Sequence, residues 1–474
     1  MLAIRRAALA LFTMLWIGAS MSARTPPDHQ PAVAMAGPNI AGPTAPIGAF
    51  ANGTVLPNGR LVTPIGTRYD LGDFPLGLAI SPDGALAVAI NSGLGYGLNS
   101  GKQSYCTSDP NRVPCPYANP PDPTLTATAG NAAEVAPDQS LSVIDLHTGR
   151  SRVITAVRTG QDPAQRGMPG AYNFFYTGVL FSPDGRHLYA AGGGNDAVYD
   201  FPVTADVVAA RPARTIILPT PLLKLIGGVV PALRGTAGFT RSLAITPDGR
   251  YLLVTHEINN ALAIINTATF SARELSFGPP ILQGVYPAGI VVRPDGKAAY
   301  VALQGAHRVA VIGLDAAGQA RQVGTIMVGD HPTALAVSPN GSQVYVANTG
   351  GDSLSVVDTA SARVTQTIDL RVLPGEQAGA SPDAVAVSPN GRRLYVALAG
   401  DDAVAVLAAS PTTARPAPLS FTLAGFLPTG WYPSAVAPSP TGDRLYVASA
   451  KGLGSRPLAV ADSFQYDGDN MPGL

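Results

Sequence analysis

The chain has 474 residues, of which 31 are basic and 31 acidic, so its formal net charge is zero. This balance argues against a surface that coats nucleic acid, because phosphate binding requires clustered lysine and arginine. Only 13% of the residues are charged, whereas glycine (52) and proline (44) are abundant, a composition that favours many short strands joined by tight turns.

The N-terminal residues have the pattern of an export signal. "MLAIRR" is basic, "AALALFTMLWIGAS" is a short apolar run, and "MSAR" offers small residues for cleavage after Ala23. The apolar run is short for a transmembrane helix, so we interpret residues 1–23 as a signal peptide rather than an uncleaved anchor. The mature protein is then expected in the periplasm or outside the cell, without a membrane span.

Residues 24–60 are rich in proline and alanine and are expected to be flexible. Further along, residues 91–139 lack any alternation of apolar and polar residues, which predicts a long loop. This loop contains the two cysteines of the chain, Cys106 and Cys115, in "CTSDPNRVPC". In an oxidising compartment they are expected to form a local disulfide; two unpaired thiols are the alternative.

A proline–glycine turn recurs seven times. It reads "SPDG" at 81 and 182, "TPDG" at 246, "RPDG" at 293, "SPNG" at 338 and 388, and "SPTG" at 439. The successive intervals are 101, 64, 47, 45, 50 and 51 residues, and a period in this range indicates a repeat architecture. The long first interval is explained by the predicted loop at residues 91–139.

Each turn is flanked by runs that alternate apolar and small polar residues, such as "DAVAVSPN" before it and "RLYVALAG" after it, followed by third and fourth runs such as "DSLSVVDT" and "ARVTQTIDL". Alternation with a period of two is typical of strands. Four antiparallel strands repeated seven times predict an all-β fold, a seven-bladed β-propeller over residues 61–460. A β-helix would need shorter coils, and a sandwich would not give seven similar hairpins.

The last repeat contains only two clear strands, and residues 66–72 are expected to supply its fourth strand from the N-terminal side. Residues 461–474 are polar and turn-like. We therefore expect an incomplete last blade, followed by a truncated tail.

The "LYVAN"-like second strands and "SVIDT"-like third strands resemble the YVTN-repeat propellers. The stretch "PTGWYPSAVAPSPTGDRLYVASAKGLGSRP" and the early "LPNGRLVTP" resemble the propeller of bacterial exported proteins that fuse it to an alkaline-phosphatase-like phosphoesterase domain. The resemblance implies a metal-dependent domain after the propeller, which this sequence lacks, so no phosphoesterase activity is assigned to the chain.

No catalytic motif is identified. "GDSLS" at 351–355 spells an esterase signature, but it stands before a third strand, so Ser353 is interpreted as a turn residue. "HEINN" at 256–260 lacks the second histidine of a zinc-protease motif. We therefore assign no catalytic residue, no metal site and no cofactor from these motifs.

Propeller geometry places the loops before first strands, and those before third strands, on one face around the central channel. Aromatic and polar side chains that converge on such a mouth indicate a binding site. The predicted binding residues are Phe74, Tyr176, Arg241, His256, Glu257, Tyr286, His331, Asp383, Trp431 and Tyr432. Alternatively, the aromatic residues pack blades together and the Asn and Asp residues of these loops satisfy turn backbone.

Two hypotheses for function follow. In the first, the chain is a binding or scaffold module whose mouth holds a small molecule, a peptide or an adjacent phosphoesterase domain. In the second, it is a propeller hydrolase such as a lactonase, with Asp383, His331, Glu257 and His256 as candidate acids, bases or ligands.

Overall fold

The computed structural model describes most of residues 74–451, with gaps at 93–138, 156–174, 195, 219–238, 279–283, 373–378 and 411–418, and short pieces between residues 48 and 71. The predicted signal peptide, Cys106, Cys115 and residues 461–474 lie outside the described residues. None of the helices in the described part is long and apolar enough to cross a membrane.

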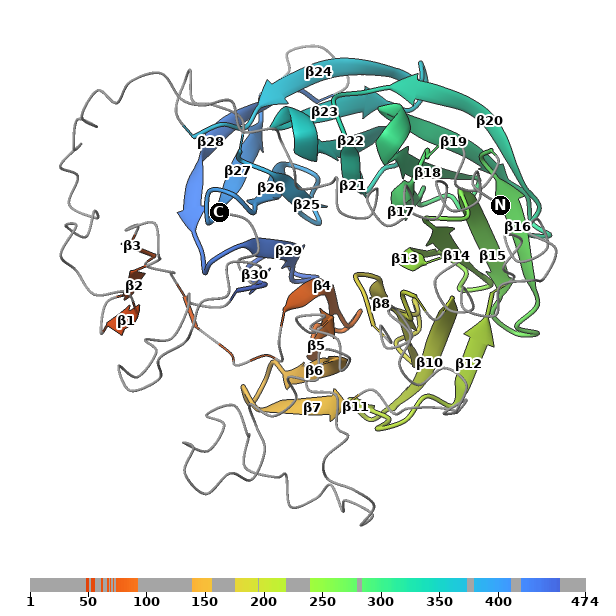
Figure 1. The fold of residues 1–474 in the computed structure, drawn as a ribbon, viewed down its shortest axis with the longest axis horizontal. Coiled ribbons are helices and arrows are strands. Elements are labelled where there is room, and N and C mark those ends of the chain that lie inside the picture. The colour runs from red at the N-terminus through yellow and green to blue at the C-terminus, as the bar shows by residue number, and fades with distance from the viewer. Residues whose placement is uncertain are drawn as a thin grey trace, which may run out of the picture.

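Seven antiparallel sheets stand around a central axis (Figure 1). We number them as blades 1 to 7 in chain order. Blade 1 comprises β4 (Pro75–Ile80), β5 (Leu86–Ser92), β6 (Gln139–Asp145) and β7 (Ser151–Thr155). Blade 2 comprises β8 (Val179–Phe181), β9 (His187–Ala191), β10 (Ala197–Thr204), β11 (Val207–Val208) and β12 (Arg214–Ile217). Blade 3 comprises β13 (Thr240–Ile245), β14 (Tyr251–His256), β15 (Ala261–Asn266) and β16 (Ala272–Ser276).

The remaining blades continue in the same order. Blade 4 comprises β17 (Pro287–Val292), β18 (Ala298–Leu303), the 3-10 turn η4 (Gln304–Ala306), β19 (Arg308–Leu314) and β20 (Ala320–Met327), and blade 5 comprises β21 (Pro332–Val337), β22 (Gln343–Asn348), the 3-10 turn η5 (Thr349–Gly351), β23 (Ser353–Asp358) and β24 (Arg363–Asp369). Blade 6 comprises β25 (Pro382–Val387), β26 (Arg393–Leu398), β27 (Ala403–Ala409) and β28 (Phe421–Pro428). Blade 7 comprises β29 (Pro433–Pro438) and β30 (Leu445–Ser449). The prediction of an all-β propeller is confirmed.

A further small sheet, formed by β1 (Gly48–Phe50), β2 (Gly53–Val55) and β3 (Leu61–Val62), lies outside the ring (Figure 1). Its first two strands fall within residues 24–60, which the sequence predicts to be flexible. The propeller itself begins at β4.

The apolar core lies between neighbouring blades rather than inside any one of them. Second strands such as β14 are buried along their whole length, whereas outer strands such as β20 are largely exposed. Val88 and Ile90 of blade 1 share a cluster with Leu188 and Tyr199 of blade 2. Because each sheet is apolar on both faces, it can bury both only with a neighbouring sheet on each side, and a closed ring meets that requirement.

The ring closes where blade 7 meets blade 1. β29 lies beside β4, and the Ser434 hydroxyl donates a hydrogen bond to the Pro75 carbonyl oxygen (2.5 Å). Residues 66–72 were expected to add a strand to blade 7, but none of the described residues in this stretch is assigned to a strand. Tyr69 and Leu71 instead pack against the blade 1 cluster that Tyr446 also contacts.

Each recurring turn joins the first strand of a blade to its second strand, as Ser81–Gly84 joins β4 to β5. Side chains of each turn form hydrogen bonds that hold the turn together. For example, the Ser388 hydroxyl donates to Asn390 Oδ1 (2.8 Å) and accepts from the Arg393 N–H (2.9 Å). The turn glycine has φ between +70° and +77° at all seven positions, which favours glycine over residues with a Cβ.

These glycines also lie against the turn proline of the preceding blade. A methyl group built on Gly391 would lie 3.3 Å from Cδ of Pro339, and one on Gly84 would lie 3.4 Å from Cδ of Pro440, which links blade 1 to blade 7. The same contact recurs at Gly185, Gly249, Gly296, Gly341 and Gly442. The turn motif therefore recurs in every blade because it serves the packing between blades as well as the geometry of the hairpin.

Replacement of Gly391 by alanine tests this contact. Gly391→Ala should lower the free energy of unfolding by about 1–2 kcal/mol, because φ is positive and the methyl group meets Pro339. Gly324→Ala is the matched control, since nothing lies within 4 Å of the added methyl group, and it should change stability by less than about 0.5 kcal/mol. Equal urea midpoints for the two variants would contradict this account.

Candidate functional site

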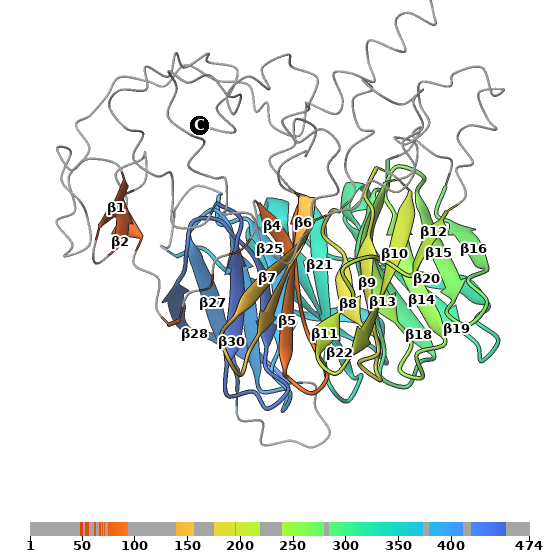
Figure 2. The ribbon, with the colours of Figure 1, turned by 90° about the horizontal axis from the view of Figure 1, so that it is seen from below.

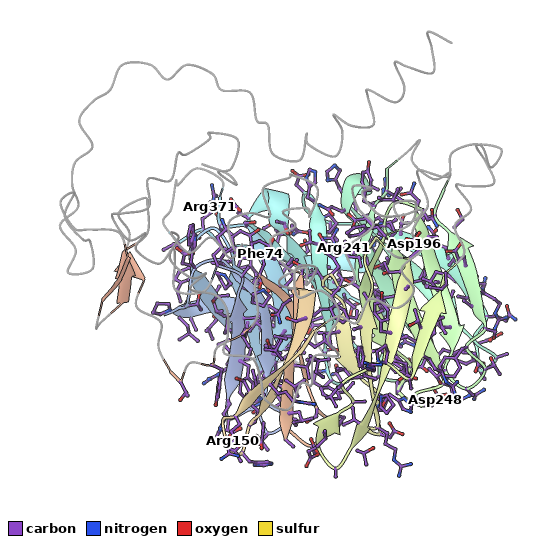
Figure 3. The ribbon with its side chains drawn as sticks, turned by 60° about the horizontal axis from the view of Figure 1, so that its bottom comes forward. Phe74, Arg150, Asp196, Arg241, Asp248 and Arg371 are labelled. Atoms are coloured by element: carbon purple, nitrogen blue, oxygen red, sulfur yellow. The ribbon has the colours of Figure 1, made fainter. Side chains whose placement is uncertain are left out.

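The two ends of the ring differ in what they display. The first strands β4, β8, β13, β17, β21, β25 and β29 contact one another in turn around the axis, with all strands standing along it (Figure 2). Figure 3 shows Phe74, Arg241 and Asp196 at one end, which we call the mouth, and Arg150 and Asp248 at the other, where the turns lie.

A β-bulge near the start of the first strands orients side chains at the mouth. The register of β25 on β26 shifts between Pro382 and Ala384, which leaves Asp383 as the extra residue. In β13 the shift falls between Thr240 and Leu243 and includes Arg241. Bulges redirect a side chain and are frequent beside functional sites.

The corresponding bulge residues in other blades are uncharged: Leu76, Ala288, Thr333 and Ser434. Blades 3 and 6 therefore contribute two charged residues of opposite sign at a position that the fold does not require to be charged.

Arg241 is the centre of a polar cluster. Its Nη1 donates hydrogen bonds to Glu257 Oε1 (2.9 Å) and to Gln304 Oε1 (3.0 Å) on the neighbouring blade. Its side chain is 17% exposed. Burial alone would lower the pKa of Arg241, but Glu257, Tyr176 and Asp383 together raise it, so Arg241 is a permanent cation at the mouth.

Asp383 approaches the same cation from the other side of the channel. Burial raises the pKa of Asp383, although hydrogen bonds from Tyr432 and Ser381 and the charge of Arg241 oppose the increase. Burial also raises the pKa of Tyr176 and of Tyr432, so both phenols stay protonated. We call Tyr176, Arg241, Glu257, Gln304, Asp383 and Tyr432 the mouth cluster.

Aromatic rings extend the mouth on the side of blades 7 and 1. The rings of Phe74 and Tyr432 are stacked with centroids 6.5 Å apart. The ammonium of Lys451 lies 4.7 Å from the ring centre of Trp431 and 5.1 Å from that of Tyr432, and burial lowers the pKa of Lys451. This side of the mouth offers flat apolar surfaces beside a cation.

Most acidic and amide residues before the third strands serve the backbone, as the structural alternative predicted. The side chain of the residue just before a third strand accepts a hydrogen bond from a backbone N–H of the next blade. That N–H belongs to the residue just before the first strand of the next blade, and both residues have positive φ. We call this contact the inter-blade clasp. Its pairs are Asp196 with Phe239 (2.6 Å), Asn260 with Tyr286 (3.2 Å), His307 with His331 (3.3 Å), Asp352 with Ser381 (2.9 Å) and Asp402 with Tyr432 (3.0 Å).

The predicted residue His256 does not reach the mouth surface. It is fully buried between blades 2 and 3, with Nε2 3.2 Å from Asp196 Oδ1 and Nδ1 2.8 Å from Glu274 Oε1. Asn259 also contacts its Nδ1 (3.1 Å). A side chain with no exposed surface cannot touch a ligand, so the structure places His256 in a buried ionic network.

Two other predicted residues lie at the rim. Tyr286 is 39% exposed, and its ring covers the backbone at Gly284 and Gly305, where an added methyl group would collide. His331 is half exposed and pairs with Asp330. The structure thus brings Phe74, Tyr176, Arg241, Glu257, Asp383, Trp431 and Tyr432 to the inner mouth and leaves Tyr286 and His331 outside the cluster.

Gln304 is a member of the mouth cluster that sequence reasoning missed. It follows β18 as the first residue of η4, where the only signal is a long polar side chain in a turn. Its role depends on reaching Arg241 across a blade boundary, and no local pattern reveals that.

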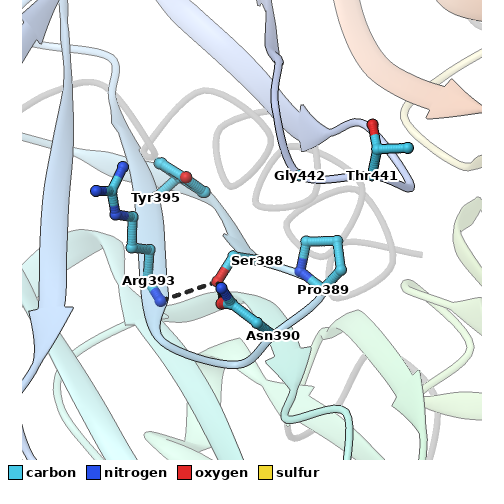
Figure 4. Close-up of a pocket in the computed structure, with 7 residues that line it drawn as sticks. All are labelled: Ser388, Pro389, Asn390, Arg393, Tyr395, Thr441 and Gly442. Atoms are coloured by element: carbon cyan, nitrogen blue, oxygen red, sulfur yellow. Dashed lines mark hydrogen bonds between the residues drawn. The ribbon is translucent and has the colours of Figure 1, made fainter.

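A hollow at the opposite end of the ring is formed by the turns of blades 6 and 7 (Figure 4). Its lining consists of Ser388, Pro389, Asn390, Arg393, Tyr395, Thr441 and Gly442. The lining includes Pro389 and Gly442, which form the proline–glycine contact that every blade repeats, and the first residues of β26. We therefore assign this hollow to blade packing and keep the mouth as the candidate site.

Comparison with known proteins supports the propeller fold. Residues 178–367, from blade 2 to blade 5, match the family described as "Lactonase, 7-bladed beta-propeller". No curated protein matches the chain.

Among solved structures, a periplasmic gluconolactonase from Pseudomonas aeruginosa is 19% identical, with 85% of this chain and 98% of that chain covered and a TM-score of 0.53. A Bacteroides uniformis protein named as a candidate 6-phosphogluconolactonase is 18% identical, with 66% and 86% covered and a TM-score of 0.50. A chain of the mitotic checkpoint complex is 13% identical, with 91% and 95% covered and a TM-score of 0.52. Likeness at this level demonstrates the propeller fold alone.

The buried network around His256 predicts a pH-dependent stability. Burial would lower the pKa of His256, but hydrogen bonds with Asp196 and Glu274 raise it above its ordinary value of 6.5. The stabilisation from the charged form is therefore fully present below pH 6.5 and is lost as the pH rises through the folded-state pKa.

His256→Gln should then lower the free energy of unfolding by about 3 kcal/mol near pH 6, because two carboxylates lose their cation, and by less near pH 9. Thermal unfolding of both proteins at the two pH values measures this difference. His147→Gln, at an exposed turn, is the control. A deficit that does not change with pH would contradict the charged network.

Proposed function

We propose that the chain hydrolyses a cyclic ester at the mouth cluster. The observation that carries this proposal is that Arg241 and Asp383, at bulges in blades 3 and 6, lie close enough for their charges to interact, and that the protonated phenols of Tyr176 and Tyr432 interact with the same two groups. The match of residues 178–367 to a lactonase family supports the same class of reaction.

Lactone hydrolysis adds one water molecule across the ring ester. The hydroxyl joins the acyl carbon, negative charge develops on the carbonyl oxygen, and the ring oxygen leaves with a proton. A site for this reaction needs a base for the water, a donor for the oxyanion and an acid for the leaving oxygen.

The mouth cluster offers each of these groups. Asp383 as a carboxylate would take the proton from water and return it to the ring oxygen. Arg241 would donate to the developing oxyanion, because Glu257 and Gln304 both accept from Nη1 and a guanidinium carries five N–H donors. Tyr432, hydrogen-bonded to Asp383, would orient the carboxylate.

The aromatic side of the mouth favours a ring-shaped, polar substrate. Phe74, Tyr432 and Trp431 offer faces against which a sugar-like ring can pack, and Lys451 lies over two of them. A hydroxylated lactone such as glucono-1,5-lactone fits this surface in chemistry, and the name of the Pseudomonas aeruginosa protein mentions the same class.

The binding-module hypothesis uses the same mouth and is favoured by the same aromatic residues. It differs in expecting a bound small molecule or peptide without turnover. Export to the periplasm, and descent from a propeller–phosphoesterase fusion, remain predictions.

Hydrolysis of glucono-1,5-lactone above the spontaneous rate, followed by acid release, is the first test. Asp383→Thr should lower kcat by about 10²–10⁴ through loss of the base. Arg241→Thr should lower it by about 10²–10³ through loss of the oxyanion donor. Threonine stands at the equivalent bulge of blade 5 as Thr333, so both variants keep a residue that this position accommodates.

Arg250→Thr, at the opposite end of the ring, is the matched control and should keep the native rate, since its side chain is 57% exposed and contacts Asp248, Tyr251 and the Ala316 carbonyl oxygen, far from the mouth. Turnover equal to the spontaneous rate, or turnover that Asp383→Thr leaves unchanged, would contradict the proposed hydrolase and favour a binding module.

The reaction should also depend on pH through Asp383. Burial raises the pKa of Asp383 above its ordinary value of 3.8, and only the carboxylate can accept a proton. The value of kcat/KM should therefore fall as the pH decreases through this raised pKa, with a midpoint above that of an ordinary aspartate. A profile that is flat down to about pH 4 would exclude Asp383 as the base.

A further inference from the structure

Three donor atoms meet at the rim of the mouth, between blades 4 and 5. Nδ1 of His307 lies 2.7 Å from Oδ1 of Asp330, and Nδ1 of His331 lies 2.9 Å from the same oxygen. All three atoms lie within 4.8 Å of one another. The side chains are between 47% and 51% exposed, so the group is open to solvent.

This group is a departure from the repeat. At the other inter-blade clasps Asp or Asn occupies the position of His307, and Phe, Tyr or Ser occupies that of His331. The clasp needs only one acceptor, which Asn260 supplies in blade 3. The fold therefore does not require either imidazole, yet the two rings lie 5.2 Å apart at this one described junction.

Both imidazoles direct the same ring atom to one carboxylate. Nδ1 of His307 lies 2.7 Å from Asp330 Oδ1 and also 3.3 Å from the His331 backbone N–H. Each short N···O contact suits a hydrogen bond in which Nδ1 carries the proton. A metal ion that displaces these protons would bind the same nitrogen and oxygen atoms.

The backbone of blade 5 leaves space beside the donor atoms. A methyl group built on Gly350 would lie 2.8 Å from Nδ1 of His331 and 3.0 Å from Oδ2 of Asp330. Gly350 belongs to η5, and its N–H donates to the Asp330 carbonyl oxygen (3.2 Å). The absence of a side chain at Gly350 keeps the donor atoms accessible from this side.

We propose that His307, Asp330 and His331 bind one divalent transition-metal ion, with Zn²⁺ as the representative. Two imidazole nitrogens and one carboxylate oxygen are a ligand set that zinc prefers, with the fourth position left to water. Ligands about 2.1 Å from a tetrahedral ion lie about 3.4 Å apart, so Asp330 Oδ1 would need to move away from the two nitrogens by about 0.5–0.7 Å. The site is separate from the mouth cluster, although His307 follows Gln304 in the same turn.

Titration calorimetry with zinc sulfate on the full chain, without a histidine tag, tests the proposal. The native protein should bind one ion per chain. His307→Asn and His331→Ser take the residues that stand at the equivalent positions of blades 3 and 6, so they should keep the fold while removing a ligand. Each variant, and Asp330→Asn, should weaken zinc binding by more than the roughly 10–100-fold typical of an outer-shell change.

Gly350→Ala should weaken binding as well, because its methyl group would meet His331 Nδ1. His147→Asn removes an exposed imidazole elsewhere and should bind like the native protein. Asp383→Thr should also bind zinc normally, which separates this proposal from the proposed hydrolase. Native affinity in His307→Asn or His331→Ser, loss of affinity in Asp383→Thr, or no one-to-one binding by the native chain would overturn the metal site.

Discussion

Contact between neighbouring blades is the constraint on which the rest of this structure depends. Each sheet is apolar on both faces and can be buried only between two others, so the blades must close a ring. At all seven junctions the turn glycine of one blade lies against the turn proline of the previous one, including Gly84 on Pro440 where the ring closes. Closure is reinforced by the hydrogen bond from Ser434 to Pro75.

Because of this packing, the two ends of the ring tolerate different amounts of sequence variation. At the turn end, seven blades need the same residues for the same contact, and variation there is expected to reduce stability. At the mouth, the inter-blade clasp needs only an acceptor, and the bulge of the first strand accommodates Leu, Ala, Thr, Ser, Arg or Asp. Function can therefore change at the mouth without a change of fold.

Three groups of ionisable residues differ in how far they are exposed. Between blades 2 and 3 the ionisable groups are buried, and His256 forms a structural network with Asp196 and Glu274. Across the channel Arg241 and Asp383 stay partly accessible and can act on a substrate. Between blades 4 and 5 His307 and His331 are exposed around Asp330. Burial is what separates these roles, because the residue types are similar.

The sequence by itself determined the architecture and the end of the ring at which a site lies. Seven proline–glycine turns flanked by alternating runs specify both the strands and their antiparallel pairing, since turn chemistry and alternation are local properties. The same repeat identified Arg241, Glu257, Asp383 and Tyr432 as mouth residues. Only the tertiary structure decided which of them meet. Arg241 donates a hydrogen bond to Gln304 on the next blade and interacts by charge with Asp383 three blades away, whereas His256, next to Glu257, is buried in the core. Such contacts depend on bulge geometry and blade placement, and residues far apart in the chain come together only when the ring closes.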